Sequence, residues 1–173
     1  LLDPTGIQIV ADTTAARPDL TFDGANFLLV WESGSFGSSD VWGTRVAGDG
    51  RILDPGGFPI AAAPNWQDNA RVASGGGQSL VVFEDGRCFA VGRICSAIYG
   101  ARVATDGTVL DPSGFVVTDG SNTRMAPAAA SDGTGFLVAW EDDRTTSGVH
   151  DIWGARVASD GTVVDTAGVP IFV

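Results

Sequence analysis

Residues 140–161 read WEDDRTTSGVHDIWGARVASDG, and the main features of this stretch recur twice earlier in the chain. Each copy opens on an aromatic residue followed by Glu, continues with an aromatic-Gly-x-Arg-Val block and ends on an Asp-Gly pair. The aromatic-Glu pairs are Trp31-Glu32, Phe83-Glu84 and Trp140-Glu141, and the Asp-Gly pairs begin at Asp49, Asp106 and Asp160. Equivalent positions are spaced by about 50 to 60 residues, which indicates three copies of one structural unit.

Each unit is expected to form four short β-strands. The second strand is almost continuously apolar, as in residues 27–31 (FLLVW), which is typical of a strand covered on both faces. The Asp-Gly pair after the third strand favours a tight hairpin, so the third and fourth strands should pair antiparallel. The first three strands are predicted over residues 19–22, 27–31 and 41–47 in unit one, 71–73, 80–83 and 98–104 in unit two, and 128–130, 136–140 and 152–158 in unit three.

Repeated four-stranded antiparallel units of this size are typical of a β-propeller. We predict an all-β fold: a β-propeller segment of three four-stranded blades plus one extra strand, in a single repeat domain over residues 1–173. The blades cover residues 17–61, 69–118 and 126–173. Residues 1–10 match the ending of unit one and are expected to be the fourth strand of a preceding blade. The alternative fold is a β-trefoil, which also has three four-stranded repeats but no place for the extra strand.

The repeat resembles that of secreted bacterial β-propeller proteins. The motifs that carry the resemblance are aromatic-Glu-Asp-x-Arg, then Asp-Ile-Trp-Gly-x-Arg-Val, then Asp-Gly, all present in unit three. Unit two keeps the first motif in residues 83–87 (FEDGR), whereas unit one departs from it in residues 32–35 (ESGS). The resemblance implies an extracellular propeller and assigns no activity.

Composition limits the classes of partner. The chain has 44% hydrophobic and 18% charged residues, which is enough apolar material for a packed domain. Its net charge of −11 opposes binding to nucleic acid or to an anionic membrane surface, and we expect neither partner. The chain starts at Leu1, and its single methionine is Met125, so we expect it to be trimmed or excised from a longer protein.

The three repeated glutamates invite comparison with the carboxylate pairs of glycosidases. Recurrence argues against catalysis, because such a reaction needs one acid and one base rather than three equivalent copies. Three arginines recur in the neighbouring strand, so we predict repeated structural pairs that fix strand register. The predicted pairs are Glu32 with Arg45, Glu84 with Arg102, and Glu141 with Arg156. We assign no catalytic residue.

The Asp-Gly pairs are interpreted as turns. They lack the alternating oxygen ligands and the distant Glu of an EF-hand, so structural calcium is kept only as an open alternative and no other metal or cofactor is expected. His150 is the single histidine and falls in an expected loop. Without a nucleophile elbow or a second histidine, a place on a polar loop is preferred to a triad or a zinc site.

Cys88 and Cys95 flank residues 89–94 in the longest loop between second and third strands. Two cysteines cannot make a structural zinc site, whereas a pair at this spacing can close a loop in an oxidising compartment. We therefore predict a disulfide, worth about 2–3 kcal/mol in the loop-entropy model.

Two sets of variable connections should emerge on one side of the blades. They are the loops over residues 33–39, 85–96 and 142–150 and the links between units over residues 11–17, 62–69 and 119–126. Variable loops on a rigid scaffold are typical of binding surfaces, although loops also vary where nothing constrains them. The candidate ligand-binding residues in these loops are Phe36, Trp66, Phe89, Arg93, Arg124, Arg144 and His150.

The preferred function is that of an extracellular binding or scaffolding module that presents these loops to a glycan or protein ligand. The alternative is a part of a propeller hydrolase or lyase whose catalytic residues lie outside this chain. Three blades leave both ends of the array open, so we expect further blades of a parent chain, or another subunit, to close the ring.

Overall fold

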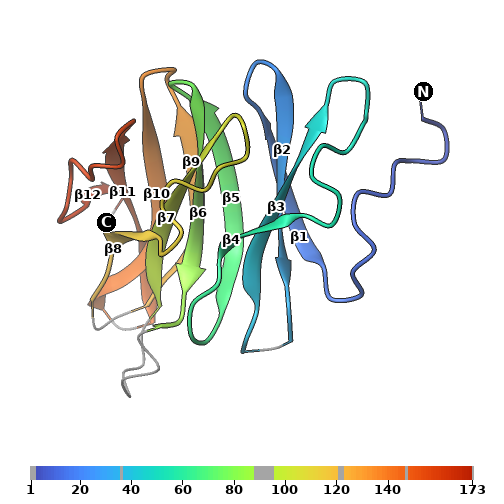
Figure 1. The fold of residues 1–173 in the computed structure, drawn as a ribbon. Coiled ribbons are helices and arrows are strands. Elements are labelled where there is room, and N and C mark those ends of the chain that lie inside the picture. Colours follow the sequence, from blue (N-terminus) through green and yellow to red (C-terminus); the bar gives the residue numbers. More distant parts are fainter. Residues whose placement is uncertain (1–2, 36, 88–95, 121–122, 147, 173) are drawn as a thin grey trace.

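The structure is a computed structural model that describes residues 3–35, 37–87, 96–120, 123–146 and 148–172 (Figure 1). Its regular elements are all β-strands. The strands are β1 (Ala16–Phe22), β2 (Asn26–Ser33), β3 (Asp40–Ala47), β4 (Phe58–Ala61), β5 (Gln67–Gly75), β6 (Gln78–Asp85), β7 (Ala97–Ala104), β8 (Phe115–Thr118), β9 (Arg124–Ser131), β10 (Gly135–Thr146), β11 (Val149–Ala158) and β12 (Val169–Phe172). None of the described residues forms a helix long and apolar enough to cross a membrane.

The twelve strands of the described part form three separate four-stranded sheets. Each sheet is antiparallel and keeps its strands in chain order, from β1 to β4, from β5 to β8 and from β9 to β12. This is the up-and-down arrangement of propeller blades, and it confirms the predicted propeller segment. The trefoil alternative is wrong, because the four strands of each repeat pair with one another in a separate sheet.

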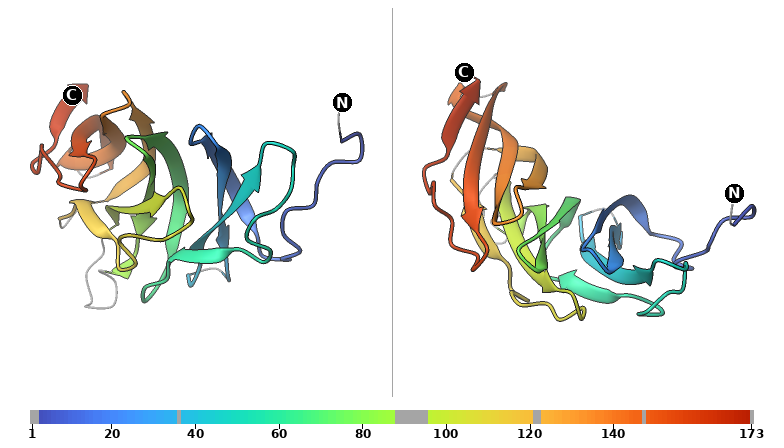
Figure 2. Two further views of the ribbon diagram at one scale, coloured as in Figure 1. Left: turned by 45° about the horizontal axis from the view of Figure 1, so that its top comes forward. Right: turned by 90° about the horizontal axis from the view of Figure 1, so that it is seen from above.

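The blades follow one another round an open arc (Figure 2). Neighbouring first strands pack together, β1 against β5 and β5 against β9, so these strands line the inner side of the arc. Short fourth strands such as β8 and β12 lie at the outer side, four residues long in each blade. The two ends of the chain lie far apart, at opposite ends of the arc.

The hydrophobic core lies between the blades. One cluster joins Val30 and Ile60 of blade 1 to Phe83 of blade 2, and a second joins Leu80 of blade 2 to Trp140 of blade 3. Strand β6 therefore buries alternate side chains in opposite directions, which is why its sequence is apolar at every position from residue 80 to residue 83. The prediction of a strand covered on both faces is confirmed for this blade.

The outward faces of the two terminal blades are only partly covered. Leu20 in β1 is 57% exposed, Leu137 in β10 is 50% exposed and Ile171 in β12 is 56% exposed. Each of these side chains points away from the neighbouring blade that the described residues supply. The apolar runs in β2 and β10 suit strands covered on both faces, but the described residues cover only one face of each terminal blade.

The chain between the third and fourth strands makes two turns. In blade 1 the amide of Gly50 donates to the Ala47 carbonyl at 2.9 Å, which closes the Asp-Gly turn at a positive φ of 86°. A second turn follows, closed by the Gly57 amide on the Asp54 carbonyl at 2.9 Å. Strand β4 then pairs antiparallel with β3, as expected, although the Asp-Gly turn does not join them directly.

The N-terminal segment departs from its prediction. Residues 1–10 are predicted to be the fourth strand of a preceding blade, and their described part, residues 3–10, forms no strand in the structure. A fourth strand pairs with the third strand of its own blade, and the described residues offer no such partner to this segment. The Ile7 side chain instead packs against the Asp-Gly turn of blade 1, where it leaves no room for a Cβ on Gly50.

Candidate functional site

The repeated glutamates connect one blade to the next. A carboxylate oxygen of Glu32 accepts the backbone N–H of Asn69, and Oε1 of Glu84 accepts the backbone N–H of Ala126 at 2.8 Å. Asn69 and Ala126 lie at irregular positions of β5 and β9 with positive φ angles of 52° and 51°. The carboxylate therefore satisfies an amide that the bulged strand cannot pair within its own sheet.

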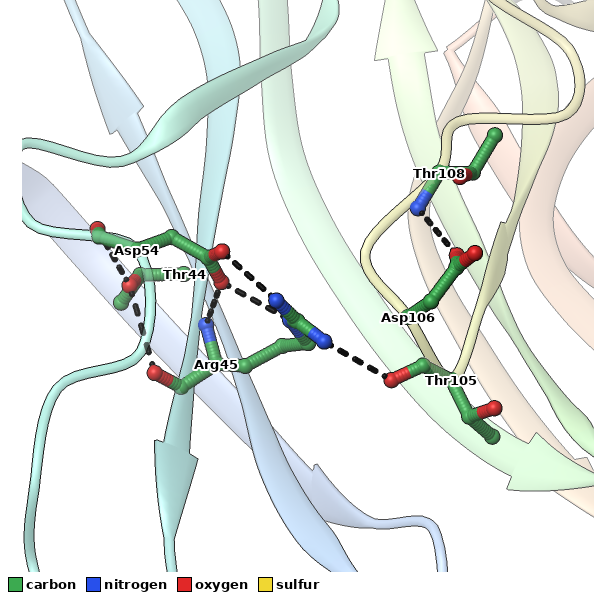
Figure 3. Close-up of polar contacts among 6 residues, drawn as sticks. All are labelled: Thr44, Arg45, Asp54, Thr105, Asp106 and Thr108. Atoms are coloured by element: carbon green, nitrogen blue, oxygen red, sulfur yellow. Dashed lines mark hydrogen bonds and ion pairs between the residues drawn. The ribbon is translucent and has the colours of Figure 1, made fainter.

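The repeated arginines pair with aspartates instead (Figure 3). Nε of Arg45 donates to Asp54 at 2.9 Å and Nη2 donates to the other carboxylate oxygen at 2.8 Å, while Nη1 reaches the Thr105 carbonyl of blade 2 at 3.1 Å. Arg102 repeats this arrangement with Asp111 and with the Ser159 carbonyl of blade 3. These forked contacts clamp each blade to the turn of the next.

The predicted Glu32–Arg45, Glu84–Arg102 and Glu141–Arg156 pairs are therefore wrong. Strand register explains the error, because Glu32 lies opposite Val41 and Arg45 lies opposite Leu28, at the other end of the blade. Arg156 pairs with Asp165. Its side chain is 68% exposed, against 19% for Arg45 and Arg102, because it has no further blade to reach among the described residues.

The variable connections meet at one end of the blades. In Figure 1 the connections from β2 to β3 and from β4 to β5 lie at the lower end, and the Asp-Gly turns lie at the upper end. The contacts agree, since the Gln67 amide donates to the Ser39 carbonyl at 2.7 Å and the Gly86 amide donates to the Trp66 carbonyl at 2.8 Å. The loop face expected from the sequence is thus formed by neighbouring segments.

The candidate ligand-binding residues differ in their placement. Trp66 is half-buried and lies against Gly86, where a Cβ would collide with the indole ring. Arg124 is buried, 3.3 Å from the Asp142 carboxylate. His150 is exposed, but in β11 rather than in the expected loop. Phe36, Phe89, Arg93 and the predicted Cys88–Cys95 disulfide lie outside the described residues.

Arg144 holds its own blade together. Its guanidinium donates to Asp142, lies 3.9 Å from the centre of the Trp153 ring and donates to the Ala167 carbonyl at 2.6 Å. Arg87 does the same in blade 2, with Asp85 and with Tyr99 at 4.0 Å. Both guanidinium groups are occupied within the blade, which accounts for the Asp-x-Arg part of the repeat without a ligand.

A polar cleft of about 300 Å³ opens on the loop face between blades 1 and 2. Its charged groups are Arg17, Glu32 and Asp68, and Ser39 and Thr14 add hydroxyls. The Arg17 guanidinium donates from Nη1 to Oε2 of Glu32 at 2.7 Å while 55% of its side chain stays exposed. The Ser39 hydroxyl donates to Asp68. This is the candidate functional site, and it gathers residues from both blades.

Burial is the main influence on the pKa of Glu32 in the cleft. It raises the pKa of Glu32, the Asn69 amide opposes this, the nearby Asp68 raises the pKa further, and Arg17 opposes it. Sequence reasoning missed Arg17, Asp68 and Ser39. For Arg17 and Asp68 the available signal was a departure from the repeat. The residues that align with them in unit three, Ala126 and Met125, carry no charge.

The Asp-Gly turns have a local explanation. In each turn the aspartate accepts the amide two residues further on, from Arg51 to Asp49, from Thr108 to Asp106 and from Thr162 to Asp160. Among the described residues no group of three or more His, Cys, Asp or Glu side chains is placed to hold a metal ion.

Comparison with known proteins supports the fold and identifies no family. No protein-family model matches the chain, and neither does any curated protein. Solved structures do match: a thermostable family-43 glycoside hydrolase superposes with a TM-score of 0.63 at 12% identity, over 91% of this chain and 55% of that one. The endo-arabinase from Bacteroides thetaiotaomicron gives 0.56 at 15% identity, over 90% of this chain and 60% of that one.

A third match is the alpha-L-arabinofuranosidase from Fusarium graminearum, with a TM-score of 0.55 at 9% identity, over 85% of this chain and 52% of that one. The fold is that of a β-propeller segment. At these identities the likeness extends to the fold alone. The chain spans only about 52 to 60% of the length of these three structures.

Proposed function

We propose that the chain forms part of a glycan-acting β-propeller and supplies it with a sugar-binding cleft on the loop face. The observation that carries this is the cleft between blades 1 and 2, where an exposed guanidinium, the Asp68 carboxylate and the hydroxyls of Ser39 and Thr14 converge. Sugar hydroxyls both donate and accept hydrogen bonds, so a fixed mixture of carboxylate acceptors and guanidinium donors suits them.

Within this proposal the chain binds and does not catalyse. Glycoside hydrolysis needs a carboxylic acid free to protonate the leaving oxygen and a second carboxylate to act as nucleophile or base. Both oxygens of Glu32 already accept hydrogen bonds, from Asn69 and from Arg17, and Glu84 repeats the amide contact with Ala126. Neither of these two glutamates is free to act in this way, and the proposal assigns the catalytic groups to residues beyond this chain. A purely binding propeller is the second candidate, favoured by the same occupied carboxylates.

Calorimetry on the full chain tests the sugar site. Arabino-oligosaccharides and xylo-oligosaccharides serve as probes, with a broad hydrolase screen run in parallel. Asp68→Asn should weaken saturable binding about fivefold or more, since the amide keeps an acceptor for Ser39 but loses the charge that strengthens bonds to hydroxyls. Asp49→Asn, in the exposed turn at the other end of blade 1, is the matched control and should change nothing.

Three results would contradict the proposal. Absence of saturable binding to any of these glycans would remove the sugar site, as would an Asp68→Asn variant with unchanged affinity. Hydrolysis of a glycan by this chain alone would show that catalytic groups lie within it. Turnover by a longer protein that contains the chain, lost when the chain is deleted, would favour the enzyme over the purely binding propeller.

A further inference from the structure

Blades 2 and 3 each hold an arginine over an aromatic ring, and blade 1 does not. In blade 3 the guanidinium of Arg144 is bonded to Asp142 and stacked on Trp153, 3.9 Å from the ring centre. Repeat alignment places Ser33 where blade 3 has Asp142, and Ser35 where it has Arg144. Blade 1 keeps the aromatic platform, Trp42, without the cation that covers it elsewhere.

A pocket of about 430 Å³ lies at this place in blade 1. Trp42, Trp31 and Ser33 line one part of it, together with Gly56, which aligns with the Ala167 that accepts from Arg144. The volume is within the range of about 300–1,000 Å³ that small-molecule sites occupy. Ser35 does not fill it, because its hydroxyl bonds to Ser38 within the loop at 2.8 Å.

The pocket wall contains a buried donor that lacks a partner. Nε1 of Trp140 in blade 3 donates to Asp142 at 2.9 Å, but the equivalent Nε1 of Trp31 has no hydrogen-bond partner among the described residues. Trp31 is 3% exposed. A buried N–H without an acceptor costs stability. Trp31 lacks the acceptor that Asp142 provides to Trp140, because Ser33 stands at the equivalent position of blade 1.

A carboxylate from another segment takes over the acidic role. Asp12, on the link before β1, lines the pocket and accepts the Ser33 hydroxyl and the Thr14 amide. These bonds, that from Ser33 first, hold the pKa of Asp12 below its ordinary value, so the group is charged at neutral pH. No cationic side chain of the described residues forms an ion pair with it.

We propose that this pocket binds the guanidinium group of an arginine side chain from a protein partner, stacked on Trp42 and paired with Asp12. The chain shows the required complementarity itself, because two of its own arginines occupy the equivalent place in blades 2 and 3. A net charge of −11 favours approach of a basic segment. Guanidinium stacks on aromatic faces and forks onto carboxylates, whereas a lysine ammonium does neither as well.

Calorimetry on the full chain tests this with the peptide acetyl-Gly-Arg-Gly-amide, its lysine counterpart and methylguanidinium. The arginine peptide should bind about tenfold more tightly than the lysine peptide. Trp42→Ala and Asp12→Asn should each weaken its binding about fivefold or more, and Trp42→Phe should restore most of it. Asp68→Asn, in the adjoining cleft but not in the lining of this pocket, should leave it unchanged, which separates this pocket from the proposed sugar site.

Three outcomes would overturn the proposal. Equal affinity for the arginine and lysine peptides would show that only charge is recognised. Methylguanidinium that binds as tightly as the peptide would assign the pocket to a small guanidinium compound rather than to a protein partner. Binding that survives Asp12→Asn would place the cation elsewhere. If Trp42→Ala does not fold, as judged by circular dichroism, Asp12→Asn together with Trp42→Phe decides the result.

Discussion

Glu84 offers a direct test of the connection between blades. It is 8% exposed, and its Oε1 accepts two hydrogen bonds, from the Ala126 amide at 2.8 Å and from Nδ2 of Asn69 at 2.7 Å. Glu141 is the equivalent residue of blade 3, and no hydrogen bond or ion pair of its side chain occurs among the described residues. We therefore compare Glu84→Ala with the matched variant Glu141→Ala.

The expected loss follows from these contacts. A hydrogen bond to a charged group is worth about 1.5–3 kcal/mol, but burial raises the pKa of Glu84, so its removal also relieves a desolvation cost. One freed donor, the amide of the exposed residue Ala126, can bind water. We expect Glu84→Ala to lower the free energy of unfolding by about 2–3 kcal/mol, and Glu141→Ala to change it by less than about 0.5 kcal/mol.

Glu84→Gln separates the hydrogen bonds from the charge. Both donors reach the same oxygen, so a single amide oxygen can accept both, and the loss should stay below about 1 kcal/mol. Urea denaturation followed by tryptophan fluorescence measures all three variants. If Glu141→Ala costs as much as Glu84→Ala, the glutamate acts within its own blade and the contact between blades is not its role. A glutamine variant as damaged as the alanine variant would show that the charge matters.

The remaining predictions concern the arginines and pH. Arg102→Ala should lower the free energy of unfolding by about 2 kcal/mol, because it leaves the partly buried Asp111 without its forked partner and frees the Ser159 carbonyl. Arg156→Ala should cost less, because its exposed side chain contacts no further blade among the described residues, and equal losses in urea denaturation would refute the clamp between blades. The Arg156 hydrogen bonds lower the pKa of Asp165 to about 2, so NMR titration should show that value in the parent chain and a return toward 3.8 in Arg156→Ala. The Arg102 hydrogen bonds also lower the pKa of Asp111, so the native chain binds fewer protons there than the unfolded chain. This contribution to stability should be present above about pH 4 and lost as the pH falls. A free energy of unfolding that does not decline on acidification would contradict it.

Local features of the chain were predictable because local residues cause them. The positive φ that an Asp-Gly pair supplies sets the turns, and an aromatic, apolar run makes a strand wherever neighbouring blades cover it. The spacing of three such units then indicates a propeller. Even the departure of residues 33–35 from the repeat was visible, although its consequence, the pocket beside Trp42, was not.

Side-chain partners followed from the tertiary structure alone. Glu32 and Arg45 lie in adjacent strands of one repeat and carry opposite charges, yet register puts them at opposite ends of the blade. The true acceptors and donors come from the next blade or from the turn before β4, and sequence spacing cannot identify them. The cleft at Arg17 and Asp68 depends in the same way on how blade 2 sits against blade 1.

The sequence by itself determined the strands of the three blades, the turns and the repeat, because each depends on residues within a short segment, and the spacing of the repeats indicated the all-β propeller architecture. Only the tertiary structure decided which groups meet: the glutamates at the amides of the next blade, the arginines at their aspartates, and Asp12 beside Trp42. The physical reason is that a hydrogen bond or a stacked ring requires atoms to lie within a few ångströms, and that proximity is set by register and by packing between blades rather than by position along the chain.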